Sequence, residues 1–531
     1  MKKKNIGLLL LGCINIGALF AGDHLITSYG AVADGRTVNT KFIQKAIDDA
    51  SAEGGGRVIV PAGNFMTGSL LLKSGVELHV NLGAVLLGSH SVSDYQKLAG
   101  RAALIIGDKQ DRISISGEGI IDGQGQELLV DIFRKLRSGE LKQDSSWLYK
   151  RPEAGRAMVL YFHGCTNVSV KDITLKNASN WVQDYRECDG IVINHMTVQS
   201  TAYWNNDGLD ITDSKNVRIT NCFINATDDA LCLKSSNPNS ACENIYVDSC
   251  TLRSSANGLK FGTANAGGFK NIKVRNLTVY DTYRSAIALE SVDGGVMENI
   301  DIRNVQATNT GNAIFIRRGH RNKTGPVSTI KGIYIANVKV QVPLLKPDQG
   351  YPIEGPPDHL RPGFDQMPVR PSNFHIYGHP FLPYNLVPAS IVGLPGYPVQ
   401  DVTLENIEIS YGGGGSKDIA NIPMESLGRV PENETGYPEF SMFGELPAWG
   451  FYIRHAEGIV FKNVSLRYEE ADFRPAIVMD DVTNSRFTDL KIPTTNDKNK
   501  PMIVLNHTND ITIKELKVPV SQDKAVVKTN Y

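Results

Sequence analysis

Two segments of the chain decide the fold: Asn167–Asn177, NVSVKDITLKN, and Gly190–Ser200, GIVINHMTVQS. Each contains a stretch in which apolar and polar residues alternate, then a polar break and a second alternating stretch. A period of two with many β-branched residues is typical of a β-strand that buries one face. Four similar units follow: NVRITNCFINA from Asn216, NIYVDSCTLRS from Asn244, NIKVRNLTVYD from Asn271 and NIDIRNVQATN from Asn299. The six units begin 23, 26, 28, 27 and 28 residues apart, so the chain is a repeat of short strands.

The repeat extends towards both ends of the chain. The further units are GVELHVNLGAVLLGS at Gly75, RISISGEGIIDG at Arg112, GIVFKNVSLRY at Gly458, NSRFTDLKI at Asn484 and DITIKELKVPV at Asp510. A unit this short cannot bury its own apolar face, so it must stack on its neighbours. Propeller blades need about 40 or more residues each, and the hairpin turns of a β-sandwich are missing. We predict an all-β fold, a parallel β-helix, right-handed by the general preference of parallel crossovers.

Three segments depart from the repeat. The segment from Thr40 to Gly55 has helical spacing of apolar residues and predicts an amphipathic helix that caps the open first coil. Residues 343–398 hold 13 of the chain's 25 prolines and predict an excursion from the coils. Residues 412–450 begin with four glycines and lack a strand pattern, so they predict a second insertion. The remaining chain, residues 23–531, is predicted to form one β-helix domain around these insertions.

The first 22 residues have the pattern of an export signal. A short basic start precedes an apolar stretch from Ile6 to about Phe20, followed by small residues near Ala21. This pattern is typical of a secretory signal peptide, and it is too short and too early for a membrane span. The alternative is lipoprotein processing at Cys13, because LLGC ends in Gly-Cys. Both alternatives predict an exported protein, periplasmic or extracellular, with an outer-membrane lipoprotein as the less favoured case.

Charge and cysteine usage exclude several classes of function. The chain has 55 basic and 56 acidic residues, which argues against a nucleic-acid partner bound by phosphate neutralisation. The six cysteines beyond Cys13 are widely spread, so we expect small buried thiols and not a disulfide framework. No CxxC pair or histidine-rich tract indicates a metal, and we predict no metal and no cofactor. A capped β-helix has little need to pair, so we expect a monomer.

A group of carboxylates is the strongest functional signal. WNNDGLDI (Trp204–Ile211) contains Asp207, and ATDDALCLKS from Ala226 contains Asp228 and Asp229. An interval of 21 residues between Asp207 and Asp228 places both segments at a similar position on adjacent coils, whose strands lie about 4.8 Å apart. For the two consecutive aspartates to face one side, the backbone must turn there.

Three carboxyl groups this close should raise the pKa of at least one of them. One protonated and one ionised carboxyl group is what the cleavage of a glycosidic bond requires. Two other interpretations remain open: an ordinary turn, which we prefer for Asp210, and a calcium site.

WNNDGLDI followed by DDALCLKS resembles the Asn-Thr-Asp-Gly and Asp-Asp motifs of glycoside hydrolase family 28, the polygalacturonase family. The resemblance covers most of the chain from ITSYGAVADGRTVNTKFIQKAID at Ile26 onwards. It implies a right-handed parallel β-helix, an inverting glycosidase and a pectic polysaccharide as the partner. It also implies that Asp228 is the general acid, that Asp207 and Asp229 activate water, and that Asn205 orients an aspartate.

The departures from the family pattern concern the substrate contacts. Asn257 in SSANGLKFGT stands where the family has a histidine, and Ala288 and Glu290 in SAIALES stand where it has the two basic residues that grip galacturonate. A glutamate there should repel a uronate. Lys234 and Lys260 are the cations expected to contact substrate in their place.

Arg284 is expected to be a solvated surface residue. We therefore predict cleavage of a rhamnogalacturonan or another galacturonate-containing linkage in preference to plain homogalacturonan. The alternatives are a β-helix polysaccharide lyase and a non-catalytic carbohydrate-binding β-helix.

Overall fold

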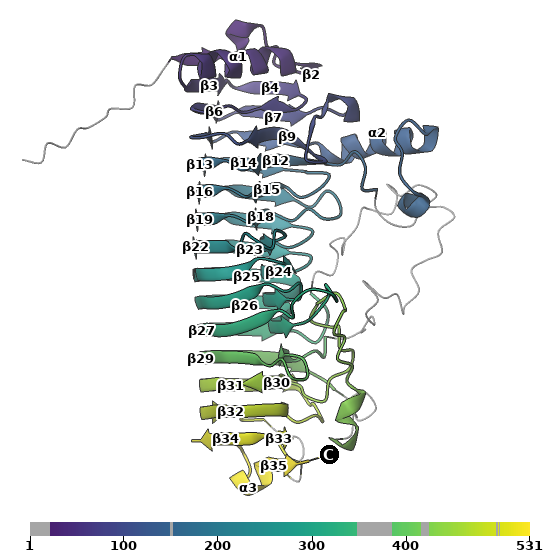
Figure 1. Cartoon of the computed structure of the whole chain (residues 1–531), viewed down its shortest axis with the longest axis vertical. Helices are drawn as coiled ribbons and strands as arrows, with labels where there is room; N and C mark the ends of the chain where they lie inside the picture. Colours follow the sequence, from purple (N-terminus) through teal and green to yellow (C-terminus); the bar gives the residue numbers. More distant parts are fainter. Residues whose placement is uncertain are drawn as a thin grey trace, which may run out of the picture.

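The structure is a computed structural model of the chain that describes residues 22–148, 152–347, 385–415, 424–494, 498 and 500–530. Residues 1–21 of the predicted signal peptide, including Cys13, and the centre of 343–398 lie outside the described residues. The rest of the chain winds into a tall stack of coils along one axis (Figure 1). Its strands form three ladders in which each strand pairs in parallel with strands of the neighbouring coils. The predicted all-β fold, a right-handed parallel β-helix, is confirmed.

From β3 to β24 the coils contribute separate short strands to the ladders, and after β24 single long strands serve more than one ladder. The first ladder contains β1 (Asp23–Leu25), β3 (Gly56–Val60), β6 (Val76–Val80), β10 (Ser114–Ser116), β13 (Thr166–Lys171), β16 (Asp189–Asn194), β19 (Lys215–Thr220), β22 (Cys242–Asp248), β27 (Thr329–Val342), β29 (Val399–Gly413), β31 (Val460–Glu470) and β34 (Asn509–Lys514). The second contains β2 (Asp34–Val38), β4 (Gly63–Thr67), β7 (Ala84–Gly88), β11 (Ile120–Asp122), β14 (Thr174–Lys176), β17 (Thr197–Ser200), β20 (Phe223–Ala226) and β23 (Thr251–Ser254).

The third ladder carries the candidate site. It contains β5 (Leu70–Leu71), β9 (Arg101–Asp108), β12 (Ala157–His163), β15 (Gln183–Arg186), β18 (Leu209–Thr212), β21 (Leu231–Ser235), β24 (Leu259–Asn265), β28 (Ala389–Val392), β30 (Phe451–Glu457), β33 (Ile503–Asn506) and β35 (Val526–Thr529). The long strands β25 (Gly268–Ser291), β26 (Val296–Arg318) and β32 (Ile477–Lys491) continue from one ladder into another, and β8 (Lys97–Leu98) pairs antiparallel with β9.

The core follows from the alternation in the sequence. In the first ladder Val168, Ile191, Val217, Ile245 and Ile272 pair in register from coil to coil, and all five are buried. Each apolar residue therefore stacks on its equivalent in the next coil, which buries a continuous apolar interior that no single coil could form.

The backbone conformation explains why the repeat units begin with asparagine. Asn216, Asn244, Asn271 and Asn299 have φ between 55° and 57°, a left-handed conformation that asparagine tolerates better than most residues. Their side-chain amides donate in sequence, from Asn244 to Asn216 at 3.2 Å, from Asn271 to Asn244 at 3.4 Å and from Asn299 to Asn271 at 2.7 Å. The repeated asparagine thus turns each coil and also bonds it to the next one.

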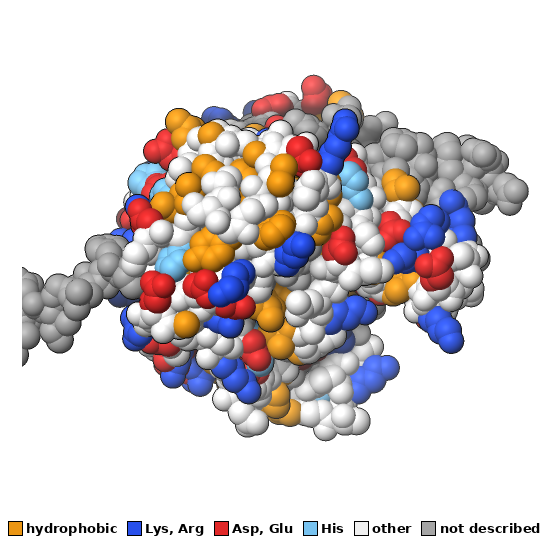
Figure 2. All heavy atoms as spheres, turned by 90° about the horizontal axis from the view of Figure 1, so that it is seen from above, with side chains coloured by type: hydrophobic (Ala, Val, Ile, Leu, Met, Phe, Trp, Pro, Cys, Tyr) orange, Lys and Arg blue, Asp and Glu red, His pale blue; other side chains and the backbone are white. Residues whose placement is uncertain are grey.

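Both ends of the stack are covered. The predicted capping helix is α1 (Thr40–Ala52), which buries Ile43, Ala46, Ile47 and Ala50 against the first coil (Figure 1). Seen from above, this end mixes acidic, basic and scattered apolar side chains, in keeping with the balanced net charge (Figure 2). At the other end lie α3 (Gln522–Ala525) and β35.

A second helix, α2 (Gly125–Ser138), projects from the side of the stack and was not predicted. Its apolar residues recur at helical spacing: Leu128, Leu129, Ile132, Phe133 and Leu136 are buried. The short 3₁₀ helices are η1 (Ile26–Tyr29), η2 (Val92–Asp94), η3 (Ser145–Leu148) and η6 (Met424–Arg429). Within the described ranges, every helix is too short or too polar to cross a bilayer. The six cysteines after Cys13 are buried free thiols, as predicted.

The two insertions differ from the prediction in one respect. Strand β28 lies inside 343–398, where no coil was expected, and it pairs with β26 and β30. The short alternating run at Ala389–Val392 was hidden by the prolines around it, and its pairing on both sides restores the ladder. In the second insertion, the described residues 424–450 contain η6 and no strand. This segment buries apolar side chains in a cluster of its own, which includes Phe440, Met442 and Phe443 packed near Phe315 and Tyr452.

Candidate active site

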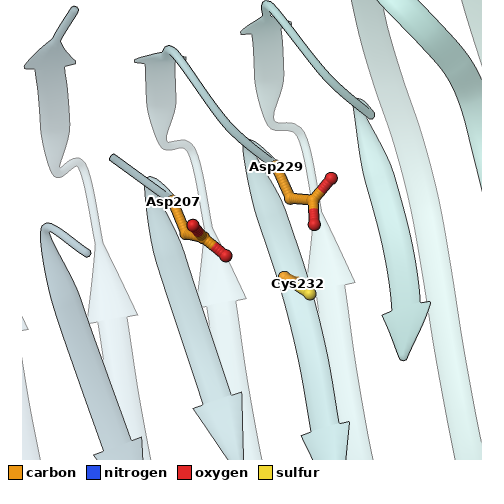
Figure 3. Close-up of side chains that lie close together, drawn as sticks. All are labelled: Asp207, Asp229 and Cys232. Carbon is orange, nitrogen blue, oxygen red and sulfur yellow. The ribbon is translucent and has the colours of Figure 1, made fainter. Parts of the chain in front are cut away.

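Two of the three aspartates lie side by side on adjacent coils of the third ladder. Asp207 stands two residues before β18, and Asp229 stands two residues before β21. Leu209 pairs with Leu231, so the two aspartates lie at the same level. Their carboxylate oxygens come within 4.8 Å of each other (Figure 3). The 21-residue spacing of Asp207 and Asp228 predicted one patch of three carboxyl groups, and the two that lie level on adjacent coils are Asp207 and Asp229.

Asp228 lies in the expected break between two strands. Residues 227, 228 and 230 are bends, so consecutive aspartates escape the alternation of a regular strand. Oδ1 of Asp228 accepts a hydrogen bond from the backbone N–H of Asp229 at 2.9 Å. Its Oδ2 accepts from Nδ2 of Asn205 at 3.1 Å, so Asn205 orients Asp228. At 7% exposure, Asp228 is the most accessible of the three carboxyl groups.

We name the first charged group in the site the Lys234 cluster: Lys234, Asp207 and Asp210. Nζ of Lys234 donates to Oδ2 of Asp207 at 2.7 Å and also to Oδ1 of Asp210. The same ammonium lies 4.2 Å from the centre of the Trp181 ring. Asp210 was predicted to support a turn, and that prediction is wrong. It is the second residue of β18, fully buried, and its role is to pair with Lys234.

Burial controls protonation in the Lys234 cluster. Burial raises the pKa of Asp207 well above its usual range, Lys234 opposes this, and the neighbouring aspartates add to the rise. Burial also raises the pKa of Asp210 to about 7, again against the attraction of Lys234. The pKa of Lys234 is lowered by burial but raised more by Asp207 and Asp210, so the lysine stays charged. Oδ1 of Asp207 is buried and has no hydrogen-bond partner among the described residues, which leaves it able to bind water.

We name the second group the Lys260 cluster: Lys260, Asp229 and Glu290. Nζ of Lys260 lies 3.0 Å from Oδ2 of Asp229 and 3.7 Å from Oε2 of Glu290. Oδ1 of Asp229 accepts from Nδ2 of Asn257 at 2.8 Å and from the backbone N–H of Asn257 at 3.3 Å. Thr263 donates to Oε2 of Glu290 at 3.3 Å.

The two carboxyl groups of the Lys260 cluster shift in opposite directions. Burial would raise the pKa of Asp229, but Lys260, Lys234 and Arg284 and the Asn257 hydrogen bonds lower it below its usual value. Burial raises the pKa of Glu290 to about 7, and Lys260 opposes the rise. Asp229 is therefore ionised at neutral pH.

The structure shows which groups surround the cations that were predicted from the sequence. Lys234 and Lys260 were predicted to bind substrate, and in the structure both ammonium groups are held by carboxylates. Arg284 was expected at the surface, and that expectation is wrong. Its side chain is 2% exposed, and its Nε lies 3.5 Å from Oε2 of Glu439.

Two residues of the second insertion reach the site and were not predicted. The hydroxyl of Tyr437 lies 3.3 Å from Nζ of Lys260, and Glu439 pairs with Arg284. The sequence carries no signal for either contact, because the insertion has no repeat that would set its position against the coils. The described residues thus bring all eight predicted site residues together and add Asp210, Arg284, Tyr437 and Glu439.

The possible ligand atoms in the site can be compared with those that a calcium ion prefers. The thiol of Cys232 lies within 4.8 Å of carboxylate oxygens of both Asp207 and Asp229 and completes a group of three potential ligands (Figure 3). Calcium prefers six to eight oxygen ligands, whereas burial raises the pKa of this thiol well above its usual range. Lys234 and Lys260 already supply positive charge to the two carboxylates. These residues fit lysine counter-ions better than a hard cation.

Residues 51–342 match the sequence model of glycosyl hydrolases family 28. The chain belongs to this family. The matched region contains both motifs, both lysine clusters and Arg284, while Tyr437 and Glu439 lie beyond it.

Individual relatives are more distant. A probable polygalacturonase from Vitis vinifera is 27% identical over 335 residues, which cover 60% of this chain and 60% of the relative. An exo-poly-α-D-galacturonosidase from Dickeya chrysanthemi is 26% identical over 351 residues, covering 57% of this chain and 58% of the relative. The chain thus spans about three fifths of the length of these relatives.

Among solved structures, an exopolygalacturonase from Thermotoga maritima matches with a TM-score of 0.56 and 21% identity, covering 73% of this chain and 87% of that one. At this identity the likeness supports the fold and carries no information on the substrate.

Proposed function

We propose that this protein is a glycoside hydrolase that cleaves an α-glycosidic bond of a pectic polysaccharide with inversion at the anomeric carbon. The observation that carries the proposal is the pairing of Asp207 and Asp229 within 4.8 Å, with Asp228 beside them on an irregular segment. Hydrolysis of this kind needs an acid for the leaving oxygen and a carboxylate for the attacking water. Three carboxyl groups in different settings can fill these roles.

Asp228 is the proposed general acid. It is the most accessible of the three carboxyl groups, and Asn205 and the backbone of Asp229 fix its orientation. A carboxyl group in this position can donate its proton to the departing glycosidic oxygen.

Asp229 and Asp207 are the proposed partners of the water. Asp229 is ionised and held by Asn257 and Lys260, so it can accept a proton from water as the bond to the anomeric carbon forms. Asp207 offers Oδ1 as a further contact for the same water. The proton balance closes when Asp229 gains the proton of water and Asp228 loses its own.

The proposed substrate is a rhamnogalacturonan or another galacturonate-containing linkage in preference to plain homogalacturonan. Glu290 supports this choice, because its buried carboxyl group stands where the family pattern has a residue that binds a uronate. The two relatives named above are a probable polygalacturonase and an exo-poly-α-D-galacturonosidase, so the proposed preference departs from the substrate in their names.

Product analysis on homogalacturonan and rhamnogalacturonan oligosaccharides tests the proposal. The wild-type chain should release saturated products from rhamnogalacturonan, and Asp228→Asn should lower the rate by about 10²–10⁴-fold. The matched control is Asp172→Asn, an exposed aspartate with φ of 59° that asparagine accommodates. Proton NMR of the first product gives the anomeric configuration. Products that absorb in the ultraviolet would instead identify a lyase, and full activity of Asp228→Asn would contradict the proposed acid.

Export is proposed on the signal pattern of residues 1–22, with lipidation at Cys13 as the alternative. Mass spectrometry of the mature N-terminus from the native host distinguishes cleavage near residue 22 from a lipidated Cys13. A monomer is proposed as well, and light scattering of the purified chain tests it.

A further inference from the structure

On the side of Asp229 that faces β24 and β25, two buried cations of the described part of the chain, Lys260 and Arg284, each contact carboxyl groups of the chain itself. Lys260 and Arg284 are each 2% exposed. Lys260 contacts Asp229, Glu290 and Tyr437, and Arg284 contacts Glu439. Two cations therefore face three carboxyl groups of the chain itself at this position.

Further contacts hold Glu439, the partner of Arg284 from the second insertion, in position. Ser441 donates to Oε1 of Glu439 at 2.7 Å and holds its carboxyl group. Burial lowers the pKa of Lys346 to about 8, a shift that the charge of Glu439 opposes, so Glu439 also acts on a second cation. Glu439 itself is 5% exposed, which a charged side chain sustains only when it is paired.

The backbone that carries Tyr437 and Glu439 is fixed to the coils. The guanidinium of Arg317 donates to the carbonyls of Glu432 at 2.6 Å and Asn433 at 3.2 Å. It also lies 5.2 Å from the centre of the Phe443 ring, and Phe443 is buried in the apolar cluster of the insertion. The insertion thus presents Tyr437 and Glu439 to the site on a supported segment.

A substrate carboxylate has no ready partner in this setting. To reach Lys260 or Arg284 it would have to displace a buried carboxylate, and the displaced group would lose its counter-ion. If nothing moved, the substrate would add another negative charge beside Asp229 and Glu290. An uncharged sugar meets neither cost, because it can use the hydroxyl of Tyr437 and the existing donors without changing any charge pair.

We propose that Glu439 and Tyr437 are specificity-determining residues that, together with Glu290, make the β24–β25 side of Asp229 a subsite for an uncharged sugar residue and exclude a uronate there. The inference rests on the proposed function, which it extends by assigning the discrimination to a segment outside the part of the chain that matches the family. It predicts that neutralising these carboxylates frees the cations for galacturonate.

Binding of trigalacturonate and of a rhamnogalacturonan oligosaccharide is the test, measured by isothermal titration calorimetry on the full chain with Asp228→Asn. Glu439→Gln and the double variant Glu439→Gln, Glu290→Gln are compared with this parent. We expect trigalacturonate to bind about tenfold tighter or more in the double variant, the effect of one freed charge-assisted contact. The affinity for the rhamnogalacturonan oligosaccharide should change by less than about threefold.

Glu434→Gln is the matched control. It lies on the same segment, pairs with His320 at the surface, and its side chain is 54% exposed, so it should leave both affinities unchanged. Thermal unfolding of each variant checks the fold, and Glu439→Gln alone decides the question if the double variant does not fold.

An unchanged trigalacturonate affinity in every folded variant would overturn the inference. Binding needs no turnover, so a chain that hydrolyses no pectic substrate contradicts the proposed function and still gives a binding result. Hydrolysis of rhamnogalacturonan with no effect of the variants contradicts this inference alone.

Discussion

The Lys234 cluster and the Lys260 cluster contain the same kinds of charged groups but differ in the pKa shifts of their carboxyl groups. Each has one buried lysine between two carboxyl groups, on consecutive coils of the third ladder. In the Lys234 cluster the pKa values of both Asp207 and Asp210 are raised.

In the Lys260 cluster the pKa of Glu290 is raised and that of Asp229 is lowered. The difference comes from the surroundings. Asp229 receives two hydrogen bonds from Asn257 and the charge of Arg284, whereas Asp207 faces three other aspartates.

Asp229 and Asp207 therefore differ as proposed partners of the attacking water. Asp229 remains ionised at neutral pH and can act as a base, while Asp207 tends to hold a proton. One lysine in a buried site therefore does not fix the charge of its partners, because hydrogen bonds and the next charges decide which carboxyl group keeps the proton.

The largest expected effect is on turnover. We expect Asp229→Asn to lower kcat by about 10²–10⁴-fold, because it removes the carboxylate that we propose as the base. Asp207→Asn should cost less, since a protonated carboxyl group and an amide can both donate a hydrogen bond. Steady-state kinetics on the cleaved oligosaccharide measures both. A larger loss for Asp207→Asn would reverse the roles of the two clusters.

Replacement of the buried lysine should lower the free energy of unfolding by different amounts in the two clusters. Lys260→Met should lower the free energy of unfolding by about 5 kcal/mol and Lys234→Met by about 3 kcal/mol, the range for breaking a buried ion pair. The loss is smaller in the Lys234 cluster because its carboxyl groups accept protons more readily. Urea unfolding at pH 7 gives both values, and Lys215→Met, a half-exposed pair with Asp189, should cost less than about 1 kcal/mol. Equal losses for the two buried lysines would argue against the difference in protonation.

Stability should also depend on pH through Glu290 and Asp210. Both groups have a pKa of about 7 when folded, against 4.5 and 3.8 without the fold. The folded chain then binds more protons between these values, so this contribution is fully present below the unfolded pKa and is lost as the pH rises towards 7.

Glu290→Gln and Asp210→Asn should each flatten the decrease in unfolding free energy between pH 5 and pH 8, by of the order of 1–3 kcal/mol. Urea unfolding at the two pH values measures this decrease. A wild-type chain that gains stability over this range would contradict both assignments.

The smallest expected effect concerns the acid. Asn205 donates one hydrogen bond to Asp228 and has φ of 51°. Asn205→Gly removes this hydrogen bond, and glycine adopts a positive φ without strain. We expect kcat to fall by about three- to tenfold, the value of one typical intramolecular hydrogen bond. The pH profile of kcat is the readout, because loss of this donor should move its alkaline limb, which reports the general acid, while a purely structural change should not.

Much of the fold could be predicted from local pattern. The alternation in units such as Asn167–Asn177 indicated strands, and the near-constant spacing required stacking, because a short amphipathic unit cannot bury its face alone. Helix α2 was missed although its apolar spacing is helical, and β28 was missed because prolines surround a four-residue strand.

The candidate site also has contacts that the sequence predicted and contacts that it did not. The spacing of Asp207 and Asp229 predicted their meeting, since register in a stack of coils follows from sequence distance. Asp210 looked like a turn residue, because an aspartate near glycine favours turns and a buried partner 24 residues away leaves no local trace. The Arg284–Glu439 pair and the contact of Tyr437 with Lys260 depend on an insertion that has no repeat.

The sequence by itself determined the stack of strands, the capping helix and the two coils on which the aspartates meet. These features depend on residues within one or two turns of the β-helix, where a regular period converts distance along the chain into position in space. Only the tertiary structure decided which cations are buried, which carboxyl group each one faces, and which segment covers them. Those outcomes depend on desolvation and on contacts as far apart as the 177 residues between Lys260 and Tyr437, and no local pattern encodes either.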